Sequence, residues 1–272
     1  MCQELWIMSF PESSRVVYKR NPLIEVICQL RFPTILRINT EGVANFQDKV
    51  RREYPLYEVK EPTIELLNAP KELTSIIEKL PFPIPAGATT HKFLTKDKRR
   101  LISLSQDFLA ISETNYQIWE LFKGEIQKAE ESLRELFNPS FYSRVGLRYK
   151  DLIKPQELGL ADKKWSELLS ANVLGELGDR YIADTIIETK TRTIIKLEEI
   201  PGAQVTLIHG LVREKGSSEN PSYLFDADFA LEKTEVTDGT LDILGKFNRL
   251  AGRLFRWAIS ESLHRAMEPE IL

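Results

Sequence analysis

The sequence has 272 residues, of which 42% are hydrophobic and 28% are charged. These values are typical of a globular protein with a substantial core, and they exclude an intrinsically disordered chain. Lysine and arginine number 37 against 40 aspartate and glutamate, a formal net charge of −3. A nucleic-acid binder that acts through its overall positive charge is therefore not expected, although a local basic face is compatible with this balance.

Two cysteines and three histidines show no metal-ligand spacing, so we expect neither a disulfide framework nor a zinc site. Low cysteine usage favours a reducing compartment. No segment reaches the roughly 18–20 apolar residues that span a bilayer, and the first residues do not have the pattern of a secretory signal. The sequence therefore predicts a cytoplasmic protein without membrane contact. Residues 1–14 precede the first strand-like pattern and are expected to form a frayed extension.

The first half of the chain, residues 15–154, combines strand and helix patterns. Alternation of apolar and polar residues predicts an extended segment with one apolar face near its start. Strands are expected at 16–38, 59–67, 92–95, 100–105, 108–114 and 141–153. Helices are expected at 41–53 and 116–136, because their apolar residues recur every three or four positions.

The second half, residues 155–272, follows a joint that we place within 151–164. Its pattern predicts a helix, then three strands, then a long helix. These elements are expected at 165–177, 183–197, 204–213, 222–232 and 240–267. Each half thus has several successive strands before a long helix. This order predicts the α+β class, with two successive halves of antiparallel sheet and long helices packed on one face.

Sequence motifs of common catalytic sites are absent. The chain has no P-loop, no GxGxxG, no GxSxG and no HExxH, and its 13 glycines do not cluster into a phosphate-binding loop. No cofactor is expected, and the sequence favours binding over catalysis without excluding an enzyme.

Two strand patterns carry groups that could act chemically. His209 shares a strand face with apolar residues, which is typical of a hydrogen-bonded core histidine, with a general base as the alternative. Asp226 and Asp228 lie two residues apart on a strand and therefore point to the same side. They could hold a divalent cation or act as acid and base, or they could simply face water while Phe225 and its apolar neighbours face the core.

A basic ridge is expected on the last helix, because four cations recur there every three or four residues. A second basic set alternates on one strand. These candidate partner-binding or nucleic-acid-binding residues are Lys246, Arg249, Arg253 and Arg256 on the helix, and Arg144, Arg148 and Lys150 on the strand. Clustered arginine is suited to phosphate or carboxylate recognition, because its guanidinium donates two parallel hydrogen bonds. The alternative is a solvated face paired with nearby acidic residues.

Three segments resemble one known family. They are NPLIEVICQLRFP followed by Phe46-Gln47 and Tyr54-Pro55, the strand YSRVGLRYKDLI, and the helix end AISESLHRAM. They resemble an uncharacterised, sporadically distributed bacterial family of similar length. The resemblance implies no activity and no role for any residue. Sporadic distribution is common among mobile genes, so it implies an association with defence or toxin–antitoxin loci.

The sequence thus leaves three hypotheses for function. The first is a non-catalytic binding or adaptor protein that contacts a protein partner. The second is a nucleic-acid-binding component that uses the basic ridge. The third is a metal-dependent enzyme that uses Asp226 and Asp228. The long amphipathic helices and sheet edges also permit a homodimer.

Overall fold

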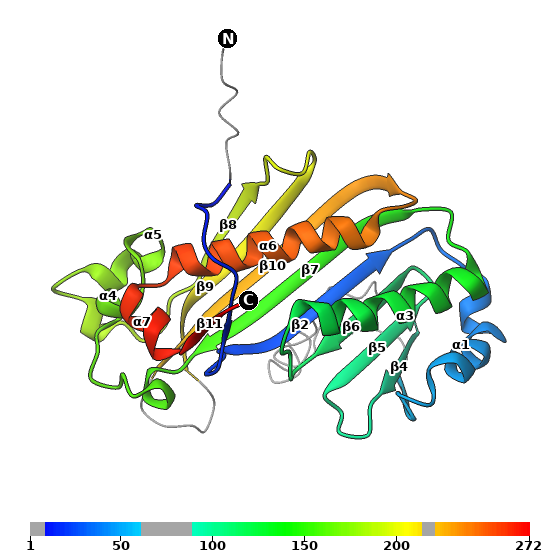
Figure 1. Cartoon of the computed structure of the whole chain (residues 1–272), viewed down its shortest axis with the longest axis horizontal. Helices are drawn as coiled ribbons and strands as arrows, with labels where there is room; N and C mark the ends of the chain where they lie inside the picture. Colours follow the sequence, from blue (N-terminus) through cyan, green and yellow to red (C-terminus); the bar gives the residue numbers. More distant parts are fainter. Residues whose placement is uncertain (1–8, 61–88, 214–220) are drawn as a thin grey trace, which may run out of the picture.

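The computed structural model describes residues 9–60, 89–213 and 221–272. Within these residues, nine antiparallel strands form one continuous sheet (Figure 1). In spatial order these are β3 (Leu56–Lys60), β4 (Thr90–Leu94), β5 (Arg100–Ser105), β6 (Phe108–Glu113), β2 (Leu23–Arg31), β7 (Tyr142–Ile153), β10 (Ser222–Val236), β9 (Ala203–Val212) and β8 (Thr191–Lys196). The predicted α+β class with antiparallel sheet and helices is confirmed.

The sheet has two halves, the strands β2 to β6 and the strands β7 to β10, which repeat one arrangement on either side of its centre. This division of the sheet falls before β7, whereas residues 141–153 were expected in the first half of the chain. The first strand of each half, β2 or β7, lies at the centre, and these two strands pair with each other. The last strand of each half, β6 or β10, pairs with the outer side of that central strand. The preceding strands follow outward in reverse order. The halves are therefore joined by a full strand ladder rather than by a linker.

Three helices lie across one face of the sheet: α1 (Gly42–Val50), α3 (Trp119–Phe137) and α6 (Thr240–Ala258) (Figure 1). Their apolar stripes and the facing residues of the strands form the main core. On β7, Val145, Leu147 and Tyr149 contribute to this core, so the residues between them point to the opposite face. Burial of these apolar side chains is the main favourable term in the stability of such a layer.

The expected helix at 240–267 is divided into α6 and α7 (Glu261–Ala266). The division occurs because Ile259 is extended and forms a β-bridge with Leu169. Ser260 then begins α7, since its hydroxyl accepts a hydrogen bond from the Leu263 amide at 3.2 Å.

The expected helix at 165–177 is broken in the same region. It consists of α4 (Trp165–Leu168), α5 (Ala171–Leu174) and a 3-10 turn at Gly175–Gly178. Ser170 is extended, and its amide donates to the carbonyl of Ala258 at 2.9 Å. Contacts with the end of α6 therefore replace a continuous helix here.

Other boundaries also differ from expectation. The segment 16–38 is divided into β1 (Val16–Tyr18), β2 and a 3-10 turn at Leu36–Asn39. The expected strand at 183–197 contains a 3-10 turn at Ala183–Thr185 and only the shorter β8. Most of the expected strand at 59–67 lies outside the described residues.

The segment before β2 is held against the body of the protein. Phe10 is buried and packs against Trp257, and Ser9 donates two hydrogen bonds to the Glu199 carboxylate at 2.9 and 2.6 Å. β1 then pairs with β11 (Pro269–Ile271) at the other end of the chain. Ser9 and Phe10 of the expected frayed extension are therefore packed, residues 11–14 are mostly exposed, and residues 1–8 lie outside the described part. Within the described residues, no helix has the length and apolar character needed to cross a membrane.

Candidate binding site

The basic residues of β7 lie on the face of the sheet opposite the helices, where acidic residues of neighbouring strands pair with them. Arg144 donates to both carboxylate oxygens of Asp228 at 2.9 Å, and also to Glu232 and Gln29. Arg144 lies over Gly146, whose missing side chain leaves room for its guanidinium. This arginine therefore links β7 to both adjacent strands.

The other two β7 cations are paired in the same way. Arg148 donates to the two oxygens of Asp226 at 2.7 and 2.5 Å, and Lys150 donates to Glu25 at 3.0 Å. These pairs are partly buried, so each charge is largely neutralised by its partner. The β7 cations therefore do not form one surface with those of α6, because the sheet separates the two sets.

The two aspartates that could bind a metal are both engaged by arginine. Asp226 and Asp228 do share one side of β10, as predicted, while Phe225 and Phe229 lie in the core. Asp226 is buried rather than solvated. No cluster of three or more potential ligand side chains occurs within 9–60, 89–213 and 221–272. The geometry gives no support for a metal centre at these carboxylates.

All three histidines are hydrogen-bonded to tyrosine. His209 is buried, and its Nδ1 lies 2.6 Å from the hydroxyl of Tyr223, which in turn donates to the Val173 carbonyl. Burial lowers the pKa of His209. His91 and His264 make similar contacts with Tyr57 and Tyr18. His209 therefore has the surroundings expected of a core histidine.

The cations of α6 follow one side of the helix, as the spacing predicted. Arg253 lies 3.5 Å from the Glu12 carboxylate, and Arg256 pairs with Glu261. Lys246 and Arg249 are exposed, and no carboxylate of the described chain lies within ion-pair distance of either. The ridge therefore carries two cations without an acidic partner in that part of the protein.

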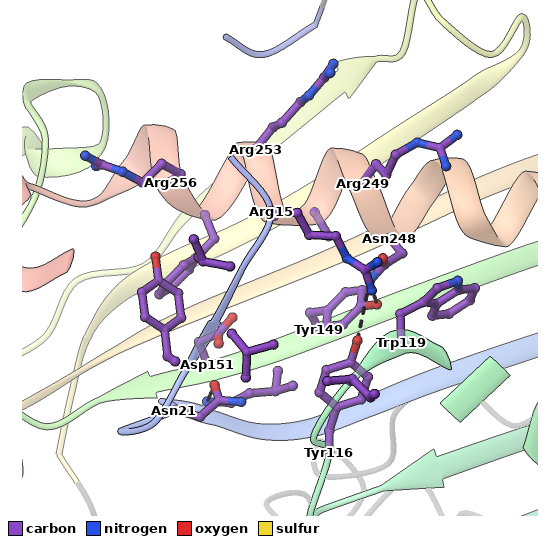
Figure 2. Close-up of a pocket in the computed structure, with 18 of the residues that line it drawn as sticks. Arg15, Asn21, Tyr116, Trp119, Tyr149, Asp151, Asn248, Arg249, Arg253 and Arg256 are labelled. Carbon is purple, nitrogen blue, oxygen red and sulfur yellow. Dashed lines mark hydrogen bonds between the residues drawn. The ribbon is translucent and has the colours of Figure 1, made fainter. Parts of the chain in front are cut away.

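A cavity of about 240 Å³ lies between α6, the strands beneath it and the N-terminal segment (Figure 2). Its walls come from residues far apart in sequence, because β1 and the segment before it cross beside α6. Arg15 on this segment pairs with Glu120 of α3 at 2.8 Å. Arg249, Arg253 and Arg256 line the cavity from α6. The ridge and the cavity are therefore parts of one site.

Asp151 of β7 lines the same cavity and is 8% exposed (Figure 2). Within the described residues, its carboxyl group has no hydrogen-bond or ion-pair partner. Burial, with a smaller effect from the Asp226 charge, raises the pKa of Asp151 to about 8. Most buried carboxyl groups have partners, so an unpaired one facing a cavity is unusual.

Other hydroxyl and amide groups that line the cavity are already paired. Asn248 donates to Tyr149 at 2.8 Å and lies 3.5 Å from the hydroxyl of Tyr116 (Figure 2). The two tyrosine rings meet edge to face, with centroids 5.9 Å apart. This network fixes the rings that line the cavity.

Sequence reasoning included Arg249, Arg253 and Arg256 but missed Asp151. The sequence did contain an indication of Asp151. This residue follows Val145, Leu147 and Tyr149 at intervals of two residues, so it lies on the apolar side of the strand. A charged residue on the core-facing side indicates a paired ion or a functional cavity. The walls contributed by Arg15 and Tyr116 come from tertiary contacts that no local pattern encodes.

Comparisons with known proteins leave the family open. No protein family model matches the chain, and no curated protein matches it in sequence. Among solved structures, it is similar to the duplicated taurocyamine kinase from Schistosoma mansoni with bound transition state analog components, at 12% identity and a TM-score of 0.38. The match covers 86% of this chain and 32% of that chain, so this chain spans about a third of that protein. A likeness this distant carries no inference about the function of this protein.

Proposed function

We propose that this is a non-catalytic binding protein that docks an acidic segment of a protein partner along α6. The observation that carries the proposal is the exposed pair Lys246 and Arg249, which lack an acidic partner in the described residues. They lie one helical turn apart, and Arg249 also lines the cavity beneath α6. Acidic side chains of a partner would pair with them, and an apolar side chain could enter the cavity.

A protein partner fits this surface better than nucleic acid does. Two of the four ridge cations already have acidic partners, Glu12 and Glu261. The β7 cations lie on the other face, and the whole chain has a net charge of −3. Binding to a phosphate backbone gains most from many unpaired cations along one track. The ridge has only two cations without an acidic partner in the described residues, which is few for binding a phosphate backbone. An acidic segment of a protein can be bound by a few cations.

The test is recovery of partners from native cells by the tagged protein, after nuclease treatment. The ridge variant is the double substitution Lys246→Glu and Arg249→Glu. Arg52→Glu with Lys96→Glu is the matched control, because both residues are exposed, lie away from α6 and give the same change in net charge. Like charges facing each other across an interface cost several kcal/mol. We therefore expect the ridge variant to bind the recovered partner at least about tenfold more weakly than the control does.

Two outcomes would contradict the proposal. One is a protein partner that both variants retain equally, which would place recognition away from α6. The other is loss of all partners on nuclease treatment, together with salt-sensitive binding of a labelled oligonucleotide that the ridge variant abolishes. That result would favour the nucleic-acid hypothesis, because phosphate contacts weaken steeply as salt rises.

A further inference from the structure

The cavity beneath α6 has an aromatic lining and one buried polar side chain that lacks a partner in the described residues. The rings that line it come from five parts of the chain: Tyr18, Tyr116, Trp119, Tyr149, Phe225 and Phe255. Such rings stack on flat ligands, and they exclude water from the polar groups among them. The surroundings therefore suit a planar molecule of small size.

The carboxyl group of Asp151 is the polar group that this lining leaves unsatisfied. Asp151 is more than nine-tenths buried and lacks a partner in the described residues. A buried carboxyl without a hydrogen bond is unfavourable, and a ligand group that donates to it removes that cost. Because the pKa of Asp151 is raised to about 8, the group is mostly neutral near pH 7 and its carbonyl oxygen can accept from an N–H group.

The charges around the cavity indicate which second group a ligand would carry. Arg249, Arg253 and Arg256 line it from α6, and Arg15 lines it from the N-terminal segment. Arg15, Arg253 and Arg256 are paired with Glu120, Glu12 and Glu261, so the attraction of the cavity for an anion comes mainly from Arg249. Arg249 has no acidic partner in the described residues, so it is the group best placed to pair with a ligand carboxylate or phosphate.

We propose that the cavity binds a small planar anion whose ring lies among the aromatic side chains, whose N–H group donates to Asp151 and whose acidic group pairs with Arg249. The proposal does not depend on a protein partner and adds a small-molecule site to the function proposed above. Two sources share this chemistry: heteroaromatic carboxylates and nucleoside phosphates.

The test is titration calorimetry with matched probes. Indole-3-acetate carries a ring N–H and a carboxylate. 1-Methylindole-3-acetate lacks the N–H group, and indole-3-ethanol lacks the carboxylate. The four nucleoside 5′-monophosphates form the second arm. We expect one arm to bind, and the arm that binds identifies the source. For the indole arm, loss of either polar group should weaken binding about tenfold.

Variants connect each ligand group to its residue. Asp151→Leu should weaken the N–H ligand about tenfold, Asp151→Asn should weaken it less because its amide oxygen still accepts, and neither should affect the methylated probe. Arg249→Ala should weaken the carboxylate and phosphate ligands about tenfold and leave indole-3-ethanol unchanged. Arg52→Ala is the control. Folding of each variant is checked by its thermal unfolding.

The proposal is overturned if neither arm binds the wild-type protein. It is also overturned if folded Asp151→Leu and Arg249→Ala variants bind as the wild type does. Failure of this test leaves partner docking on α6 intact, because that function is measured with a protein partner and with Lys246→Glu and Arg249→Glu together.

Discussion

At the scale of single residues, Asp151 is the main departure from the pattern of a stable core. Every other charged side chain discussed on β7 has an acidic partner. Asp151 instead faces the aromatic side chains of the cavity, and the Asp226 charge on the other side of the sheet adds to the rise in its pKa. Tyr18 lies close enough for the Asp151 charge to affect the pKa of its hydroxyl. A residue kept in such surroundings lowers stability and is better explained by binding than by folding.

This residue predicts a pH dependence of stability. In the unfolded chain the Asp151 carboxyl ionises near its usual pKa of 3.8, whereas in the folded protein its pKa is about 8. Between these values the folded state holds a proton that the unfolded state releases, so rising pH destabilises the fold. The loss is at most about 1.4 kcal/mol per pH unit and ends above the folded pKa.

Asp151→Asn removes this loss. We expect the variant to gain stability relative to the wild type as pH rises from about 5 to about 8, by up to about 4 kcal/mol. Urea unfolding of both proteins across this range measures the difference. A difference that does not change with pH would show that Asp151 is ionised in the folded state or paired there.

At the scale of elements, the close packing of α1 on α3 depends on Gly42. A Cβ atom at this position would lie 2.5 Å from Cε1 of Phe137 and 2.6 Å from the backbone carbonyl of Arg37. Gly124 on α3 has no atom within 4 Å of the same position. The two helix glycines thus differ in their surroundings and form a matched pair.

Alanine at these glycines should have opposite effects. Gly42→Ala should lower the free energy of unfolding by about 1–3 kcal/mol, because α1 must move away from α3. Gly124→Ala should raise it by about 0.5–1 kcal/mol, because alanine restricts the unfolded chain and favours helix. Denaturant unfolding of both variants measures these changes, and equal effects of the same sign would refute the packing described here.

The elements also show what local patterns can predict. β5 and the long helix α3 were predicted within a few residues, because their apolar residues alternate or recur within a single face. The end of α6 was not predicted, because Ile259 is extended and pairs with Leu169, a residue distant from it in sequence. Such pairing depends on tertiary contacts that propensity and periodicity do not include.

At the scale of the whole molecule, one sheet separates two sets of cations that the sequence had grouped together. The set on α6 lies on the helical face beside the cavity, and the set on β7 lies on the other face in ion pairs. The spacing of the basic residues predicted both sets. The side of the sheet on which each set lies depends on how α6 packs, which the spacing does not show. The arginines of the candidate site could therefore be predicted from the sequence. The residues that complete the lining of the cavity could not.

The central claim is that recognition occurs on the helical face at α6. Arginine modification by phenylglyoxal, mapped by mass spectrometry, tests this claim directly in the wild-type protein. In the free protein, Arg249 and Arg265 should both react, because both are exposed and Arg265 has a side chain 78% exposed. With saturating partner or ligand, the account predicts that Arg249 is protected while Arg265 still reacts. Equal modification of Arg249 with and without the bound molecule would contradict it.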